Sequence, residues 1–329
     1  MSGVRTIRVE AADEGLRVDR WFKRHFPGLG HGRLEKLLRT GQVRVDGGRV
    51  KAGTRLETGQ SVRVPPLPEA AEQAAAPAKP SAGPRPGDRD LVRSLILHED
   101  DSVIVLNKPP GLAVQGGSGT VRHLDAMLGA LERKGERPRL VHRLDRDTSG
   151  ALVVARTRKA AAALAKSFQT RRTRKLYWGL TSGVPKPRRG EIDLALAKQG
   201  GPAREKMGPA GEAPDARRAI TRYAVLGEAP PRAAWLALSP VTGRTHQLRA
   251  HCAAIGTPLI GDRKYGGAAA QPGGFDKRLH LHARSLTFLH PDGREISVTA
   301  PLPDHMERAF GLLGFDPGTA SDPFAEEGS

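Results

Sequence analysis

Apolar residues follow two spacings along the chain, and each spacing predicts a different kind of element. Short runs that are apolar, or that alternate with polar residues, predict β-strands. These runs lie at Val103–Leu106, Ala151–Ala155, Lys175–Leu180, Thr221–Leu226, Ala234–Ser239, Ser285–Leu289 and Glu295–Ala300. Apolar residues three or four positions apart predict helices at Thr120–Arg133, Lys159–Thr170, Thr245–Ile255 and Asp304–Leu313. The strands and helices do not alternate regularly, so we expect an α+β fold with a mixed, largely antiparallel central sheet.

The first 65 residues have a pattern of their own. Apolar residues at helical spacing in LRVDRWFKRHF predict one helix, and HGRLEKLLRTG predicts a second. In the second helix, Arg33, Lys36 and Arg39 lie outside the leucine stripe. QVRVDGGRV alternates around Asp46 and Gly47, which is typical of a hairpin turn, and SVRVP predicts another short strand. We therefore expect a small basic α+β domain over residues 1–65.

The composition changes in three places outside these patterned regions. Residues 66–89 are rich in Pro and Ala and lack periodicity, which predicts an extended linker. The second domain is predicted over residues 90–315. Within it, Lys198–Arg218 is rich in Gly, Pro and charged residues and predicts a loop. Residues 316–329 are predicted to form a disordered tail.

The charge balance narrows the class of partner. The 329 residues include 53 Lys and Arg against 35 Asp and Glu, which gives a net charge of +18. Such an excess favours a polyanionic partner, above all nucleic acid, although a uniformly basic proteome would also produce it. Only 4% of the residues are aromatic, so base stacking would depend on one or two rings and not on a ladder of them. The single cysteine, Cys252, excludes an internal disulfide and a zinc site built from cysteines.

The sequence also argues against a membrane and against a metal. Residues 1–10 contain no apolar run, and no stretch reaches the ~20 apolar residues of a membrane span. We expect a cytoplasmic protein without a membrane partner. His246 and His251 are one residue off the spacing of a helical turn. His280 and His282 form only an H-x-H pair, which is a weak signal, so no metal is expected.

The most informative segment is LVHRLDRDTSGALVVART, residues 140–157. Its polar part, His142–Ser149, leads into the apolar run ALVVA and therefore lies on a loop at the mouth of a predicted strand. Loops on a rigid sheet commonly carry functional residues. Asp145 and Asp147 alternate there with two arginines. Taken alone, the stretch is either a functional site or a solvated turn.

HRLDRDTSG resembles the signature of the RluA family of pseudouridine synthases, which isomerise uridine in RNA. Further stretches resemble segments of that family in the same order: VIVLNKPPGLAVQGG, RKLYWGL, PVTGRTHQLRAH, and GTPLIGDRKYG followed by LHLHARSLTFLHP. The helices, glycine and short strands of residues 1–65 resemble an S4 RNA-binding domain. The resemblance implies a pseudouridine synthase catalytic domain over residues 90–315, preceded by an S4-like domain. It points to the branch that modifies large-subunit ribosomal RNA.

The resemblance implies a role for four residues. Asp145 matches the catalytic aspartate, and Arg143 matches the arginine that fills the gap left by the flipped base. Tyr177 matches the tyrosine that stacks on the target base, although its place in an apolar strand alone would predict a core residue. Arg249 matches the arginine that pairs with the catalytic carboxylate.

The implied reaction suits these residue types. The bond between ribose and uracil N1 breaks, the base turns, and ribose rejoins at C5. Nothing is oxidised and nothing leaves, so no cofactor is required. A carboxylate beside the sugar can act as nucleophile or base, and the sequence leaves both roles open for Asp145. The implied partner is large-subunit (23S-type) rRNA, bound by a monomer. The alternatives are a non-catalytic rRNA-binding or ribosome-assembly factor and a metal-dependent phosphodiesterase.

Overall fold

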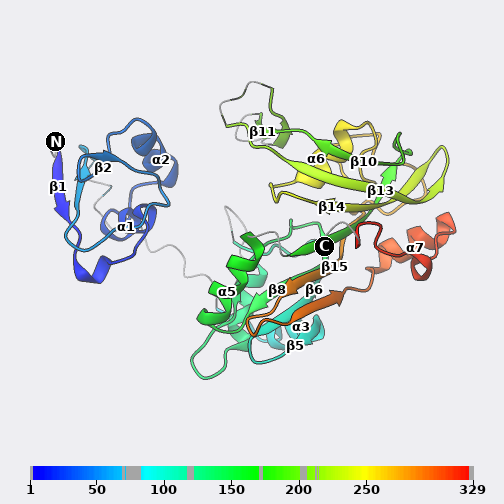
Figure 1. The fold of residues 1–329 in the computed structure, drawn as a ribbon, viewed down its shortest axis with the longest axis horizontal. Helices are drawn as coiled ribbons and strands as arrows, with labels where there is room; N and C mark the ends of the chain where they lie inside the picture. Colours follow the sequence, from blue (N-terminus) through cyan, green and yellow to red (C-terminus); the bar gives the residue numbers. More distant parts are fainter. Residues whose placement is uncertain are drawn as a thin grey trace. The chain divides into compact units, whose positions relative to one another are not determined.

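The computed structural model describes residues 3–68, 71, 83–116, 122–169, 173–200, 206–211, 213 and 215–325. The chain divides into two compact units, Met1–Ser81 and Ala82–Ser329 (Figure 1). The division falls inside the stretch that the sequence predicts as a linker. Residues 69–70 and 72–82 of that stretch lie outside the described residues.

The first unit is a four-stranded antiparallel sheet with two α-helices (Figure 1). Along the sheet, the strands are β1 (Arg5–Arg8), β4 (Ser61–Val64), β2 (Arg44–Val45) and β3 (Gly48–Arg49). The helical elements are a 3-10 turn (Ala11–Asp13), α1 (Val18–His25) and α2 (His31–Arg39). Asp46 and Gly47 have φ angles of +46° and +79°, as the predicted two-residue hairpin turn requires. Leu67 and Ala71 are buried in the core of this unit, so its packed part extends beyond residue 65.

The second unit is built on a ten-stranded mixed sheet. The main path of the sheet runs through β10 (Arg189–Asp193), β13 (Ile220–Ala229), β14 (Ala233–Pro240), β9 (Arg174–Ser182), β15 (Leu281–Leu289), β8 (Ser149–Ala155), β6 (Val103–Lys108) and β5 (Ile96–Glu99). Two strands lie off this path: β16 (Glu295–Thr299) pairs with β15, and β7 (Arg139–Leu140) pairs with β8. Among the described pairings of this sheet, only β15 with β8 is parallel. The predicted α+β fold with a mixed, largely antiparallel sheet is confirmed.

Helices cover both faces of this sheet. Side chains alternate between the two faces of a strand, so neighbouring residues of one strand pack against different helices. On β6, Val103 and Val105 pack with α5 (Arg158–Gln169), whereas Ile104 and Leu106 pack with α4 (Leu124–Met127). On β14, the even-numbered leucines pack with α6 (Gln247–Ala254), and Trp235 packs with α7 (Asp304–Leu313). A further helix, α3 (Asp88–Ser94), begins inside the segment predicted as linker. Burial on both faces explains the nearly continuous apolar runs in the sequence.

Two sequence predictions within the second unit differ from the structure. The helix predicted over Thr120–Arg133 is only α4 followed by a 3-10 turn at Leu128–Leu131, where Gly129 weakens the α-helix. The predicted loop Lys198–Arg218 contains most of a hairpin, β11 (Leu196–Gln199) with β12 (Lys206–Pro209). This hairpin is ordered by tertiary contacts, since Leu196 is fully buried with Ala219 and Ala250.

The predicted disordered tail also differs from the structure. A 3-10 turn spans Pro317–Thr319, and Phe324 is buried in the cluster that contains Trp178, Trp235 and Phe310. An apolar ring that fits an aromatic core offsets the entropy cost of ordering the chain. Residues 326–329 lie outside the described residues. No helix in the described ranges is long and apolar enough to cross a membrane.

The parallel contact between β8 and β15 fixes where the Asp145 loop leaves the sheet. Ser149 and Gly150 pair with His282 and Ala283. Gly150 has a φ of +110°, and a Cβ at this position would overlap the backbone of Ala283. Only glycine permits so close an approach with this φ. The chain that precedes β8 is therefore held against the centre of the sheet.

Candidate active site

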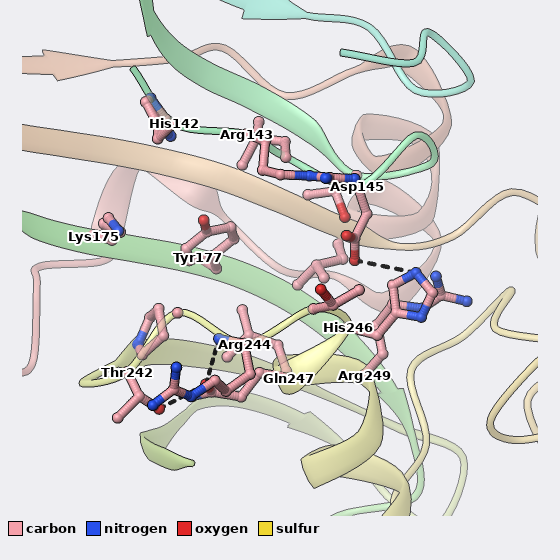
Figure 2. A pocket seen from close by; sticks show the side chains of 17 residues that line it. His142, Arg143, Asp145, Lys175, Tyr177, Thr242, Arg244, His246, Gln247 and Arg249 are labelled. Atoms are coloured by element: carbon pink, nitrogen blue, oxygen red, sulfur yellow. Dashed lines mark hydrogen bonds and ion pairs between the residues drawn. The ribbon is translucent and has the colours of Figure 1, made fainter. Parts of the chain in front are cut away.

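Two adjoining cavities lie where the loop before β8 meets the turn before α6. The first, of about 250 Å³, is lined by residues 142–148, by β9 and by residues 240–249 (Figure 2). The second, of about 720 Å³, is lined by the same loop and by segments around residues 261–264 and 276–279. Asp145, His246 and Arg249 line both cavities. These three side chains therefore form the shared wall.

Asp145 lies on the loop between β7 and β8, with its side chain 20% exposed. Its backbone carbonyl accepts a hydrogen bond from the Thr148 N–H at 3.2 Å, which closes a turn. Its Oδ2 lies 3.9 Å from Nε2 of His246 (Figure 2). A carboxylate in this position is accessible from both cavities and is partly shielded from water.

A buried lysine anchors the loop from below. The side chain of Lys108 is fully buried, and its ammonium donates three hydrogen bonds of 2.9 Å to the carbonyls of Pro109, Leu112 and Arg146. Burial lowers the pKa of Lys108 to about 7, and the carboxylates of Asp147 and Asp145 oppose this shift. Three acceptors match the three donors of an ammonium group. The bond to Arg146 fixes the backbone directly after Asp145.

Tyr177 lies in β9 and lines only the smaller cavity. Burial raises the pKa of its phenol, and the negative charge of Asp145 raises it further. The phenol therefore stays protonated at neutral pH and can offer both a ring face and an O–H donor. Tyr177 also packs partly against two core clusters, and its stacking role stays a prediction.

Two further basic side chains line the same cavity next to Tyr177. His142 accepts the Val153 N–H at Nε2 (2.9 Å) and stacks on Phe168. Burial lowers the pKa of His142 to about 3, and Lys175 adds to the shift, so the imidazole is neutral. Burial also lowers the pKa of Lys175, whose Nζ lies 5.1 Å from the Phe168 ring centroid. Arg143, in contrast, is exposed at the cavity edge.

The predicted pairing of Arg249 with Asp145 differs from the structure. Nε and Nη2 of Arg249 donate to the two carboxylate oxygens of Asp262, both at 2.7 Å. Burial acts to lower the pKa of Arg249, but the hydrogen bonds with Asp262 outweigh it and the pKa is raised. Asp262 is fully buried and requires a cation, so it takes the bidentate contact. Arg249 influences Asp145 only through its charge.

The structure also brings together two residues that the sequence does not connect with Asp145. The sequence pattern raises His246 only as a possible metal ligand and indicates no role for Tyr265, yet Tyr265 Oη lies 2.9 Å from Nδ1 of His246. Both occur in segments that resemble the family, RTHQLR and GDRKYG. The resemblance thus marks each segment as part of the family, but nothing in the sequence indicates that the two segments lie side by side.

Comparison with known proteins identifies the family to which this chain belongs. A family model described as RNA pseudouridylate synthase matches residues 102–254, which carry the Asp145 loop, β9 and the turn before α6. The chain is 34% identical over 322 residues to ribosomal large subunit pseudouridine synthase C of Salmonella typhimurium, covering 94% of this chain and 97% of the relative. The chain belongs to the RNA pseudouridylate synthase family.

Other members of the family agree. Mitochondrial RNA pseudouridine synthase 4 of Arabidopsis thaliana is 34% identical, with 89% of this chain and 78% of the relative covered. The solved structure of human RNA pseudouridylate synthase domain containing 4 superposes with a TM-score of 0.59 at 29% identity, covering 70% of this chain and 97% of that one. The activity of the chain is therefore that of an RNA pseudouridine synthase, as the sequence resemblance implied.

The buried lysine gives a test of how the loop is held. We expect Lys108→Met to lower the free energy of unfolding by about 2 kcal/mol, because three buried carbonyls lose their donor. Urea unfolding of the full chain measures the change. Lys159→Met, at an exposed lysine of α5, is the matched control and should change stability by less than about 0.5 kcal/mol. Equal unfolding midpoints for the two variants would show that the Lys108 contacts do not stabilise the fold.

Proposed function

We propose that this chain isomerises specific uridines in large-subunit ribosomal RNA, with Asp145 as the catalytic carboxylate. The proposal for the RNA is supported by the relatives, since enzymes named ribosomal large subunit pseudouridine synthase C match nearly the whole chain. The proposal for Asp145 is supported by its place in the wall between the two cavities, where one carboxylate can reach a nucleotide held from both sides.

The size of the smaller cavity favours an extruded base. At about 250 Å³ it lies below the usual range of ligand pockets, so it can take a nucleobase but not a duplex. An enzyme that works on a base inside a duplex must flip it out at a cost of a few kcal/mol. Stacking on Tyr177 would offset about 1–3 kcal/mol of that cost. We assign Arg143 to the space that the flipped base leaves in the RNA, because its side chain is exposed at the cavity edge.

The reaction then needs only groups that the cavity wall supplies. Asp145 acts at the ribose or the ring, as nucleophile or as base, while the bond from C1′ to N1 breaks and the bond from C1′ to C5 forms. The proton released from C5 is balanced by the proton taken up at N1, so the overall change is an isomerisation. No electrons leave or enter. We therefore propose that the enzyme works without a metal or cofactor.

A basic surface beside the larger cavity suits the RNA strand on either side of the target uridine. Arg263, Lys264 and Lys277 line the larger cavity and are exposed. Cations at this spacing suit phosphates of the nucleotides that flank the flipped base. The ribose would then lie between the base in the smaller cavity and the backbone along the larger one, which is where Asp145 is found.

We also propose that the first unit is an S4-like RNA-binding module. Its α2 carries three exposed cations, Arg33, Lys36 and Arg39, on the side away from the buried leucines. Such a surface binds RNA through phosphates and shape and not through base edges. We further propose that the protein acts as a monomer in the cytoplasm.

The catalytic assignment predicts that Asp145→Asn abolishes isomerisation and leaves RNA binding nearly intact, because the amide keeps the shape but can neither attack nor accept a proton. Pseudouridines would be mapped in ribosomal RNA from cells that carry the wild type, Asp145→Asn or no copy of the protein. Sites that require the protein should be lost equally in the last two. Normal modification by Asp145→Asn would show that the catalytic centre lies elsewhere.

Metal independence has its own test. Treatment with EDTA should leave the rate of pseudouridine formation unchanged and the RNA uncut, because the chemistry needs no Lewis acid. The readout is the amount of pseudouridine and the integrity of the RNA on a denaturing gel. A loss of activity that added zinc or magnesium restores would contradict the metal-free mechanism. A control with RNA refolded without EDTA excludes an effect on the RNA itself.

The role of the first unit predicts a change in salt dependence. The triple variant Arg33→Ala, Lys36→Ala, Arg39→Ala should bind RNA more weakly, and the slope of log affinity against log salt should fall by about 0.7–0.9 for each phosphate that is no longer neutralised. Turnover with saturating RNA should stay near the wild-type value. Arg232→Ala, at an exposed arginine of the β13–β14 turn, serves as control. An unchanged slope in the triple variant would refute the assignment of α2.

A further inference from the structure

The contact that the structure gives to the Asp145 carboxylate is with His246. Nε2 of His246 lies 3.9 Å from Oδ2 of Asp145 (Figure 2). This distance is too long for a direct hydrogen bond, but a substrate hydroxyl or a water could join the two groups. The predicted partner, Arg249, has its Nε and Nη2 donors committed to Asp262. The orientation of the His246 ring therefore determines which of its two nitrogens faces the Asp145 carboxylate.

The backbone of His246 is strained, and a network of side-chain hydrogen bonds holds it. His246 precedes α6 with φ +52° and ψ +21°, the left-handed region that costs a residue with a Cβ about 1–2 kcal/mol. The Oε1 atom of Gln247 accepts hydrogen bonds from Thr242 Oγ1 (2.7 Å) and from the Arg244 N–H (3.0 Å), which closes the turn (Figure 2). Strain of this kind persists where the surroundings fix it, commonly at functional sites.

Tyr265 fixes the ring of His246. Its Oη lies 2.9 Å from Nδ1 of His246, and the two rings meet edge to face at 86°. The backbone N–H of Met207, in β12, donates to the same Oη at 3.0 Å. Met207 pairs with Lys198 across the β11–β12 hairpin. An antiparallel pair alternates between inward and outward N–H groups, and this contact shows that the N–H of Met207 is directed outward.

These two contacts fit one arrangement of the protons. The Met207 N–H occupies one acceptor site of Tyr265 Oη, and the phenol proton is then available to Nδ1 of His246. A neutral imidazole that accepts at Nδ1 carries its proton on Nε2. Nε2 is the atom that faces Asp145. In this arrangement, Met207, Tyr265 and His246 form a series of donors, and the last N–H faces the carboxylate across 3.9 Å.

Burial keeps the His246 ring neutral, and the charged groups around it act in both directions. Asp145 faces it from the loop before β8, Arg249 from α6, and Asp262 and Lys264 from the segment after α6. Burial lowers the pKa of His246. Asp145 and Asp262 oppose this shift, whereas Arg249 and Lys264 add to it. A histidine with a lowered pKa is neutral at pH 7, so it donates a proton without adding positive charge.

We propose that His246 is a positioning residue for Asp145, oriented by the Tyr265 hydroxyl and by the backbone N–H of Met207. This inference rests on the proposed catalytic role of Asp145. The N–H on Nε2 faces the carboxylate and orients it through a bridging water or substrate hydroxyl. The β11–β12 hairpin thereby becomes part of the frame of the active site, because one of its backbone groups holds the hydroxyl that contacts His246 beside the catalytic carboxylate.

The test removes one contact of the Met207–Tyr265–His246 series at a time in the full-length protein. Tyr265→Phe removes the hydroxyl, and Met207→Pro removes the backbone N–H while an outward-facing position in a short edge strand tolerates proline. Each should slow single-turnover pseudouridine formation about tenfold, the equivalent of one hydrogen bond, with RNA affinity unchanged.

Three matched comparisons separate orientation from structural damage. Met207→Ala loses the same side chain but keeps the N–H, so Met207→Pro should be about tenfold slower than Met207→Ala. His246→Gln keeps an N–H donor near the place of Nε2 and should retain more rate than His246→Ala. Tyr223→Phe removes a hydroxyl that donates to the Pro187 carbonyl outside both cavities, and it should match the wild type.

The outcomes distinguish this inference from the proposed function. Unchanged rates in Tyr265→Phe and His246→Ala, together with an inactive Asp145→Asn, would overturn the positioning role alone. Equal rates for Met207→Pro and Met207→Ala, together with equal rates for His246→Gln and His246→Ala, would also overturn it, since loss of the side chain alone would then explain the slowing. Normal activity of Asp145→Asn would instead overturn the proposed function.

Discussion

The buried ion pair between Arg249 and Asp262 is the contact on which the geometry of the site depends. The two side chains are 9% and 0% exposed, and such a pair is tolerated only when its geometry is good and its other oxygen lone pairs are bonded. Two hydrogen bonds of 2.7 Å meet the first condition. The backbone N–H groups of Lys264 and Tyr265, which donate to Oδ1 of Asp262, meet the second. The pair thereby joins α6 to the segment that carries Tyr265, and Tyr265 orients His246.

The carboxylate is held from the opposite side by backbone and not by a second ion pair. Lys108 binds the carbonyl of Arg146, and Gly150 lets β8 approach β15 closely enough to fix the end of the same loop. Neither residue touches substrate in the proposed mechanism. Both act by restricting a short loop between two fixed points, which limits the positions that Asp145 can occupy to a narrow range.

The sequence predicts the parts of this arrangement that local pattern determines. β6 and β8 are buried on both faces and are therefore apolar throughout, and a polar loop that abuts such a strand is visible without a structure. The partner of Arg249 is determined by the tertiary structure and not by local sequence. The sequence shows a cation and several carboxylates, and only the fold decides that Asp262 receives both hydrogen bonds while Asp145 receives none from it. The β11–β12 hairpin is ordered by the burial of Leu196 and by the hydroxyl of Tyr265, neither of which can be read from its Gly- and Pro-rich sequence.

The choice of a neutral partner has a chemical consequence for Asp145. A cation in direct contact stabilises a carboxylate but also lowers its basicity and nucleophilicity, because the charge that makes it reactive is the charge that the cation neutralises. Here the guanidinium of Arg249 is already paired, so its field at Asp145 is reduced by the opposite charge of Asp262. The imidazole that faces the carboxylate supplies direction without a full charge. A site of this construction holds the carboxylate in place without pairing it directly with a cation, which is what either role, attack or proton transfer, requires.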